Sequence, residues 1–314
     1  MKHIMSGIAA LLVSATALAA QQPAAGAAQG RGQRPAPDPR DMGGGRCAAN
    51  PYNCADATNP LPAINTVWLE EMTWMDVRDA MKAGKRTIIV PTGGVEPNGP
   101  WLALGKHNYV LQSNCDAVAR KLGNALCAPI VKFVPEGDYA TKSGHMASPG
   151  TITMREETFR AILEDIARSL QAHGFENIVF IGDSGGNQDG QKAVAEKLNV
   201  EWAGKTVVAH IPQYYDYPGT AKHFAEQKLI VDGKSDEMHD DPIISLNMFN
   251  TDPNTIRYEQ RVKAGKASIN GVDLSNRAKS AELAKKIVDY RATIAAEAIR
   301  KAIANKGKSA ATAQ

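Results

Sequence analysis

The 314-residue sequence lacks several features that would place it in common protein classes. Beyond residue 20 it has no run of 18 apolar residues, so no transmembrane helix is predicted. It has no basic stripe with interleaved aromatic residues, and its net charge is only +3, which argues against a nucleic-acid partner. It has four cysteines but no Cys-x-x-Cys pair, so a thiolate zinc site is not expected. It also has no internal repeat.

The first twenty residues differ from the rest of the chain. Lys2 and His3 precede an apolar run over 8–13, and residues 17–19 supply the small residues of a cleavage site. This pattern predicts a secretory signal peptide over residues 1–20. We therefore expect a periplasmic or secreted protein that has no membrane segment after cleavage.

The predicted export makes the cysteines candidates for disulfide bonds, because disulfides persist in oxidising compartments. Residues 21–62 are rich in Gln, Ala, Gly, Pro and Arg, which predicts a disordered linker. Within it, Cys47 and Cys54 lie close together and are expected to form a disulfide. Cys115 and Cys127 fall in apolar patterns and are interpreted as buried thiols.

Strand and helix patterns alternate from residue 64 to residue 211. Short apolar runs predict strands over 87–90, 125–134, 178–181 and 206–211. Helical spacing and capping residues predict helices that begin at Thr73, near Leu111, at Thr153, near Asn187 and near Ser275. Residues 212–272 show no clear pattern.

This alternation predicts a three-layer α/β/α sandwich with a mostly parallel sheet. The hydrophobic content of 43% is enough for a large core. We assign the folded domain to residues 63–305 and a disordered tail to residues 306–314.

The loop after the strand at 87–90 carries the first candidate site residues. Gly93 and Gly94 allow a tight turn, Glu96 follows it, and His107 precedes the next helix. Because ligands of parallel α/β sheets bind beyond the carboxyl ends of the strands, Glu96 and His107 are candidates for a site.

The segment Gly182–Asn187 follows a predicted strand and precedes a helix. It matches Gly-x-Ser-x-Gly, the nucleophile elbow of α/β hydrolases, with Ser184 as nucleophile. That elbow needs an acid and then a histidine after the serine, yet no histidine lies in the final 75 residues. The alternative is a Gly-rich turn at a helix N-terminus, which binds anions or allows close packing. The Gly-Asp-Ser-Gly-Gly of trypsin-like proteases is rejected, because those proteins are paired β-barrels.

His239 lies among four acids in the stretch 236–241. Such a charge run is usually a solvated loop. Oxygen donors beside an imidazole also suit Zn²⁺ or Mn²⁺, so both interpretations stay open.

Four segments, in order, resemble the creatininase (creatinine amidohydrolase) family over roughly residues 66–250. Pro91–His107 is similar to the family's Pro-x-Gly-Ser-x-Glu-x-His-Gly-Pro-His-Leu-Pro-Leu-x-Thr-Asp, and His145–Thr151 is similar to His-x-x-x-Pro-Gly-Thr. Gly182–Asn187 aligns with Asn-Gly-His-Gly-x-Asn, and His239–Asp241 is loosely similar to His-Ala-Gly.

The resemblance implies an oligomeric hydrolase that cleaves C–N bonds in small amides, including cyclic ones, with divalent ions such as Zn or Mn. It implies metal ligands at Glu96, His107, Asp183 and His239. It implies catalytic roles for His145, His239 and Asp183. Substrate contacts are expected from Asn98, Ser184 and Asn187.

The sequence departs from the family pattern at the ligand positions. Asn98 and Ser184 stand where the family has histidines, His107 replaces an aspartate, and Gly186 replaces a glutamate. A metal-dependent amidohydrolase with a remodelled site, which one metal ion could occupy, is the preferred hypothesis. A non-catalytic relative that binds a small molecule and a serine hydrolase that uses Ser184 are the alternatives.

Overall fold

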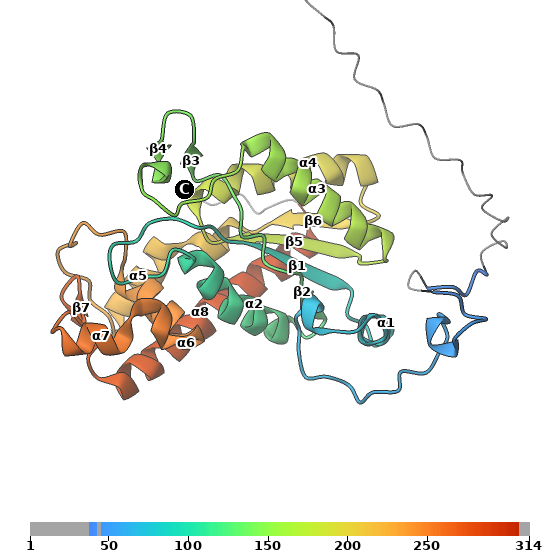
Figure 1. Ribbon diagram of the computed structural model, residues 1–314, viewed down its shortest axis with the longest axis horizontal. Coiled ribbons are helices and arrows are strands. Elements are labelled where there is room, and N and C mark those ends of the chain that lie inside the picture. Colours follow the sequence, from blue (N-terminus) through green and yellow to red (C-terminus); the bar gives the residue numbers. More distant parts are fainter. Residues whose placement is uncertain (1–37, 43–44, 308–314) are drawn as a thin grey trace, which may run out of the picture. The chain divides into compact units, whose positions relative to one another are not determined.

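The computed structural model describes residues 38–42 and 45–307 (Figure 1). The chain divides into an N-terminal unit that ends at Pro60 and a large unit that begins at Leu61. The predicted signal peptide, the predicted linker up to residue 37 and the tail from residue 308 lie outside the described residues. Within the described ranges, no helix combines the length and apolar character needed to cross a membrane.

The N-terminal unit is held by local contacts around the predicted disulfide. Cys47 and Cys54 are bonded, which confirms the prediction. A short 3-10 helix, η1 (Pro51–Asn53), begins at Asn50, whose side chain accepts a hydrogen bond from the Tyr52 N–H. The Asp41 carboxylate accepts a 2.7 Å hydrogen bond from the Cys47 N–H. A covalent link and two side-chain caps therefore order a segment that has little apolar surface to bury.

Four parallel strands form the central sheet of the large unit, in the order β2–β1–β5–β6. The strands are β1 (Thr87–Thr92), β2 (Ala125–Cys127), β5 (Asn177–Gly182) and β6 (Val207–His210). The inner strands β1 and β5 pair along their full length, from Thr87 opposite Asn177 to Thr92 opposite Gly182. They are nearly continuous apolar runs because both of their faces are covered.

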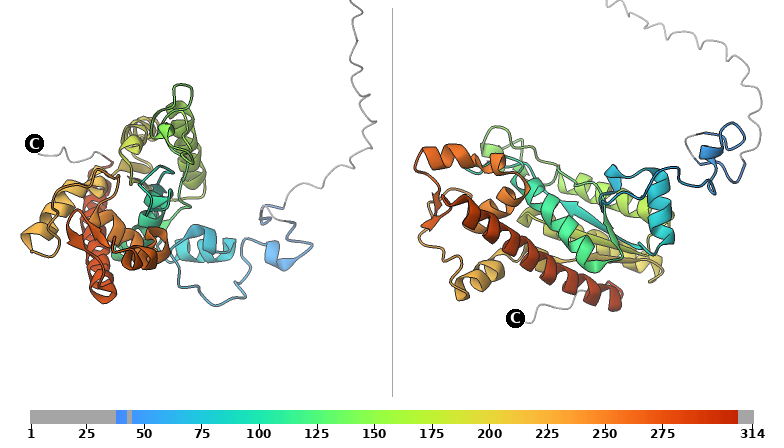
Figure 2. Two further views of the ribbon diagram at one scale, coloured as in Figure 1. Left: turned by 60° about the vertical axis from the view of Figure 1, so that its left-hand side comes forward. Right: turned by 90° about the horizontal axis from the view of Figure 1, so that it is seen from below.

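Helices cover both faces of this sheet, which confirms the predicted three-layer α/β/α fold (Figure 1). Alternate residues of a strand point to opposite faces. Ile89 and Val179 pack against α2 (Lys106–Leu122) and α8 (Arg277–Ala304), which run side by side in Figure 2. Their neighbours Ile88 and Phe180 pack against the helices of the other layer, α3 (Glu156–Ala172) and α4 (Gln188–Trp202).

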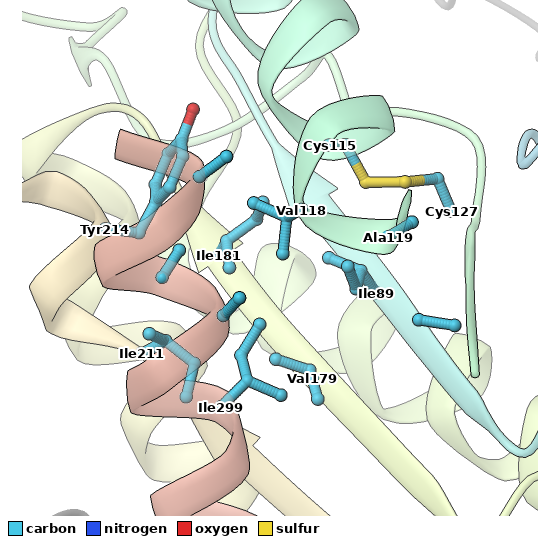
Figure 3. Close-up of a cluster of buried hydrophobic side chains, with 14 of the residues drawn as sticks. Ile89, Cys115, Val118, Ala119, Cys127, Val179, Ile181, Ile211, Tyr214 and Ile299 are labelled. Atoms are coloured by element: carbon cyan, nitrogen blue, oxygen red, sulfur yellow. A yellow bond between two sulfur atoms is a disulfide. The ribbon is translucent and has the colours of Figure 1, made fainter. Parts of the chain in front are cut away.

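Cys115 and Cys127 form a second disulfide, so the interpretation of these residues as buried thiols is wrong (Figure 3). Helix α2 packs over the edge strand β2, which brings the two Cα atoms to 6.3 Å although they are twelve positions apart in the sequence. Both side chains are fully buried among Val118, Ala119 and Ile89. Helical and strand periodicity could not reveal this pairing, because a disulfide cysteine and an apolar residue give the same pattern.

Two element boundaries also differ from prediction. The strand expected over 125–134 is only three residues long, because the chain leaves the sheet before Pro129. Helix α3 begins at Glu156 rather than at Thr153. The Thr153 hydroxyl accepts from the Glu136 N–H and donates to the Gly137 carbonyl, so it ties down a loop instead of capping a helix.

The unassigned region 212–272 contains three helices, α5 (Tyr217–Glu226), α6 (Pro242–Thr251) and α7 (Tyr258–Lys263). They pack with α2 and α8 in a separate apolar cluster. Every residue of α6 from Pro242 to Phe249 is buried. A helix that is buried on all sides has no polar face, which explains why periodicity did not find it.

The remaining elements are short. The predicted capping box of Thr73 and Asp76 begins α1 (Trp74–Lys82). Two small antiparallel hairpins pair β3 with β4 and β7 with β8. Their strands are β3 (Gly137–Asp138), β4 (Ser143–Gly144), β7 (Ser268–Ile269) and β8 (Val272–Asp273). The 3-10 helices of the large unit are η2 (Leu69–Glu71), η3 (His145–Ala147), η4 (Gly185–Asn187), η5 (Pro212–Tyr215) and η6 (Pro253–Ile256).

Candidate metal centre

A cavity of about 850 Å³ lies beyond the carboxyl ends of β1 and β5. The loop after β1, the loop after β5 and the β3–β4 hairpin contribute to its lining. Five ionisable side chains among those that line it are Glu96, Glu136, His145, Asp183 and His239. The predicted placement of the site at this edge of the sheet therefore coincides with the cavity.

Glu96 is the centre of the cluster and is only 1% exposed. Its Oε1 lies 2.8 Å from Lys106 Nζ and 3.0 Å from His107 Nε2, and its Oε2 lies 2.9 Å from His145 Nδ1. These distances are those of ion pairs, but none of the contacts has the alignment of a hydrogen bond, so both carboxylate oxygens keep acceptor capacity. Burial works against the charge, yet His107 and Lys106 outweigh it and hold the pKa of Glu96 well below its usual range.

Lys106 and His107 are the first two residues of α2, and Gly105 is its N-cap. Both side chains are buried, at 0% and 4% exposure. The helix start thus directs an ammonium group and an imidazole ring at the Glu96 carboxylate. Burial disfavours a charged His107, but its contacts with Asp183 and Glu96 prevail and raise its pKa.

Asp183, at the end of β5, is the second buried carboxylate, and every side of it is bonded. Its Oδ2 lies 2.9 Å from His107 Nδ1, and its Oδ1 accepts from Arg291 Nη2 at 2.9 Å. The Tyr217 hydroxyl lies 2.9 Å from both oxygens. Burial would raise the pKa of Asp183, but the charges of Arg291 and His107 lower it overall.

Arg291 comes from the middle of α8 and is 3% exposed. Its guanidinium lies 4.5 Å from the ring centroid of Tyr214 and 4.3 Å from that of Tyr217. It also donates to the Tyr214 carbonyl and to the Asn247 side chain. The cation–π contacts and the hydrogen bonds fix this cation against Asp183.

One group of side chains in the described ranges can hold a metal ion: Glu96, His145 and His239, whose ligand atoms lie within 4.8 Å of one another. One carboxylate and two imidazoles are ligands that zinc and manganese accept. The unused acceptor capacity of the buried Glu96 oxygens also fits a cation. Burial and the charge of Lys106 lower the pKa of His239, so its ring is available as a neutral ligand. The donor set therefore fits one divalent ion.

Two of the four ligands expected from the sequence, Glu96 and His239, belong to this group, and His145 joins them. His145 was expected to act in catalysis. The other two expected ligands, His107 and Asp183, are bonded to each other through His107 Nδ1. Their roles stay predictions, but in this arrangement their coordinating atoms are already in use.

The three expected substrate residues occupy different environments. Ser184 lines the cavity. Asn98 donates to the Glu96 carbonyl at 2.8 Å, and Asn187 donates to the carbonyls of Thr92 and Gly93 at 2.9 Å. All three side chains are buried, but the two asparagines bond the backbone of the loop that carries Glu96, whereas Ser184 is part of the cavity lining.

The backbone at Ser184 does not resemble a nucleophile elbow. The nucleophilic serine of an α/β hydrolase lies on a sharp, strained turn between a strand and a helix. Ser184 instead has extended backbone angles, with φ −119° and ψ 150°. Within the described part of the chain, its hydroxyl makes no hydrogen bond to an imidazole. A Cβ at Gly186 would lie 2.5 Å from the Pro135 carbonyl oxygen, so close backbone packing explains the glycine there. The Gly-rich turn is the better interpretation.

Sequence reasoning missed four residues of the site, namely Lys106, Tyr217, Arg291 and Glu136. Glu136 lies beside the candidate ligands. Its Oε2 lies 3.0 Å from His145 Nδ1, and its buried Oε1 has no hydrogen-bond partner among the residues that the structure describes. Burial and the neighbouring charge of Glu96 raise the pKa of Glu136 to about 9. A Cβ at Gly94 would lie 2.1 Å from Glu136 Oε1, so only glycine leaves room for this carboxyl. The pair Gly93-Gly94 was the one sequence signal of such a close approach.

Comparison with curated proteins finds three distant relatives with different activities. The chain is 27% identical over 117 residues to the mycofactocin precursor peptide peptidase of Mycobacterium ulcerans, which is 37% of this chain and 46% of that protein. It is 25% identical to the creatinine amidohydrolase of Pseudomonas putida, over 37% and 44% of the two chains. It is 25% identical to the 3-dehydro-scyllo-inosose hydrolase of Thermotoga maritima, over 38% and 36%. The chain thus spans less than half the length of these relatives.

Comparison with solved structures finds the same fold in creatininases. A creatininase with Mn has a TM-score of 0.55 at 22% identity, and a mutant creatininase of Zn-Zn type has 0.55 at 21%. Each similarity covers 76% of this chain and 99% of the other. The family profile of creatininase, described as creatinine amidohydrolase, matches residues 70–312. The chain, with its four-stranded parallel sheet and its Glu96-centred cavity, therefore belongs to the creatininase family.

Proposed function

We propose that the protein is a metal-dependent amidohydrolase that cleaves a C–N bond with one divalent ion, zinc or manganese. The observation that carries the proposal is the meeting of Glu96, His145 and His239 at the cavity, with their ligand atoms within 4.8 Å. Family membership supports hydrolysis as the reaction class. The metals named for two similar creatininases support the choice of zinc or manganese.

The residues around the ion would orient Glu96, supply a proton and contact the substrate. A bound ion would activate water and polarise the scissile carbonyl. Lys106 and His107 keep Glu96 ionised and fix its orientation. Glu136 holds a proton beside the cavity, because its pKa is raised to about 9, and is placed to pass that proton to a leaving nitrogen. Ser184 is close enough to the cavity to contact substrate.

The size of the cavity favours a substrate larger than a small cyclic amide. Its volume of about 850 Å³ lies in the upper part of the range for sites that take drug-sized ligands. Tyr139, Tyr215 and Arg155 line it, so aromatic and charged groups are available to a longer substrate. A peptide or a substituted amide therefore fits better than creatinine itself.

A panel of linear and cyclic amides, including short peptides, tests the reaction class. We expect hydrolysis that a chelator abolishes and that Zn²⁺ or Mn²⁺ restores. Glu96→Gln should abolish the activity, whereas Ser184→Ala should retain most of it. If Ser184→Ala alone is inactive and the chelator has no effect, the protein is a serine hydrolase. Binding without turnover across the panel would favour the non-catalytic alternative.

We also propose that the protein is exported and oligomeric. The two disulfides in the described ranges support an oxidising compartment. Fractionation of the source cells and light scattering of the purified protein test the two statements separately.

A further inference from the structure

The Lys106 ammonium occupies one side of the Glu96 carboxylate. The side chain is 1% exposed, its Nζ lies 2.8 Å from Glu96 Oε1, and it donates to the His239 carbonyl at 3.4 Å. Fully buried lysines are rare unless they are paired, because the ammonium loses its hydration. The pairing with Glu96 is therefore a built interaction and not an accident of a flexible surface side chain.

We propose that Lys106 is a permanent, covalently attached substitute for a divalent ion at Glu96 Oε1, so that the centre holds at most one metal ion. The proposal refines the proposed function, but its upper limit stands whether or not an ion binds.

The two oxygens of Glu96 differ in what surrounds them. Oε1 has both Lys106 Nζ and His107 Nε2 within 3.0 Å. A divalent ion bound at Oε1 would lie against the positive charge of the Lys106 ammonium, which repels it. Oε2 lies 2.9 Å from the His145 ring, which is one of the three candidate ligands, and the third candidate, His239, has its Nδ1 3.4 Å from Oε1. The Lys106 charge therefore favours one ion on the His145 side of the carboxylate and disfavours a further ion at Oε1.

His239 Nδ1 lies 3.4 Å from Oε1 but already belongs to the three-ligand group, and the other groups near this side are committed elsewhere. Asp183 is bonded on both oxygens to Arg291, Tyr217 and His107. Gly186 has no side chain and no space for one. In residues 38–42 and 45–307, the group of Glu96, His145 and His239 is the only one with three suitable ligands in reach of each other. Within the described part of the chain, a second ion would therefore find no second group of three ligands and would face the Lys106 ammonium.

Metal titration of the chelator-treated protein tests this inference. The probes are Zn²⁺ and Mn²⁺ alone, followed by isothermal titration calorimetry and by elemental analysis after gel filtration. The wild type should bind no more than one equivalent. Lys106→Met keeps the length of the side chain but removes the charge, so it should bind a second equivalent or bind the first about tenfold more tightly or better.

Lys121→Met is the matched control. Lys121 lies on the same helix but is exposed and pairs with Asp289 at the surface, so its metal binding should equal that of the wild type. Near-ultraviolet circular dichroism checks that each variant is folded, and Lys106→Gln provides a polar replacement if the methionine variant is not.

The outcomes separate this inference from the proposed function. Two equivalents bound to the wild type, or folded Lys106 variants with no gain in affinity or stoichiometry, would overturn the inference. A wild type that binds no ion would contradict the proposed function only. A gain of metal binding in Lys106→Met would then still support the inference that the Lys106 ammonium takes the place of an ion.

Discussion

Two buried carboxylates, Glu96 and Asp183, lie on either side of His107, and the structure uses them differently. Asp183 is enclosed by the Arg291 guanidinium, the Tyr217 hydroxyl and the His107 ring. Glu96 is equally buried, but two of its neighbours, His145 and His239, have side chains that are 37% and 56% exposed. One carboxylate is closed by partners that belong to the fold, and the other faces partners that a ligand can reach.

The difference follows from where the partners originate. Arg291 lies in the middle of a 28-residue helix, and two tyrosine rings flank its guanidinium. His145 lies in a three-residue 3-10 helix after a hairpin, and His239 lies outside helices and strands. The Arg291 partner of Asp183 therefore comes from a long helix, whereas the exposed partners of Glu96 come from loop regions, where binding residues concentrate. This contrast between the two carboxylates predicts that removing a partner of Asp183 lowers the free energy of unfolding more than removing His145 or His239.

Arg291→Met should give the largest loss of stability. It takes the guanidinium away from the buried Asp183 carboxylate and leaves only His107 and Tyr217 to stabilise the charge, so the free energy of unfolding should fall by about 3–5 kcal/mol. Denaturant unfolding followed by circular dichroism measures the change. Arg300→Met is the control, since Arg300 lies on the same helix but is exposed, and it should cost less than about 1 kcal/mol. Equal losses of unfolding free energy in the two variants would show that Arg291 does not stabilise the fold through Asp183.

The disulfide of Cys115 and Cys127 should contribute the next largest amount. It ties α2, which carries Lys106 and His107, to strand β2. Replacing both cysteines by alanine should lower the free energy of unfolding by about 2–4 kcal/mol. The same replacement at Cys47 and Cys54 should leave the unfolding transition of the large unit unchanged, because that pair belongs to the N-terminal unit. A shift of the main transition in the second variant would contradict this division.

Tyr217→Phe should have an intermediate effect. It removes one hydroxyl donor from Asp183 and keeps the ring beside Arg291. A hydrogen bond to a charged group contributes about 1.5–3 kcal/mol, so a loss in that range is expected in denaturant unfolding. Tyr215→Phe, for which no hydrogen bond to Asp183 is found, is the comparison and should change stability less. No difference between the two variants would show that Tyr217 does not support Asp183.

His145→Ala and His239→Ala should change stability least, by less than about 1 kcal/mol each, because the side chains are partly exposed. Both should nevertheless lose bound metal. His223→Ala, at a half-buried histidine in a different pocket from Glu96, should leave metal content unchanged. Full metal content in either His145→Ala or His239→Ala would exclude that residue as a ligand.

The sequence was sufficient for the architecture because the inner strands are plainly apolar. Thr87–Val90 and Ile178–Ile181 predicted two neighbouring buried strands, and the loops after them contained Glu96 and Asp183. Alternating helices then allowed few arrangements other than a covered parallel sheet. The position of the site follows from these two strand ends.

The partners of the two carboxylates were harder to anticipate because they are distant along the chain. Arg291 is 108 residues from Asp183, and on a long helix it is indistinguishable from a solvated arginine. Lys106 stands at a helix start, where a lysine normally points to solvent, and only the folded structure places it against Glu96. His145 and His239 were recognised singly, but their meeting depends on two loops whose paths periodicity does not determine.

Anomalous diffraction at the zinc absorption edge, from crystals soaked in Zn²⁺, shows directly which of the two buried carboxylates binds an ion. We expect one peak per chain, bonded to Glu96, His145 and His239, and no peak between His107 and Asp183. A peak on His107 and Asp183, a pair of peaks at Glu96, or no peak in the cavity would contradict this expectation.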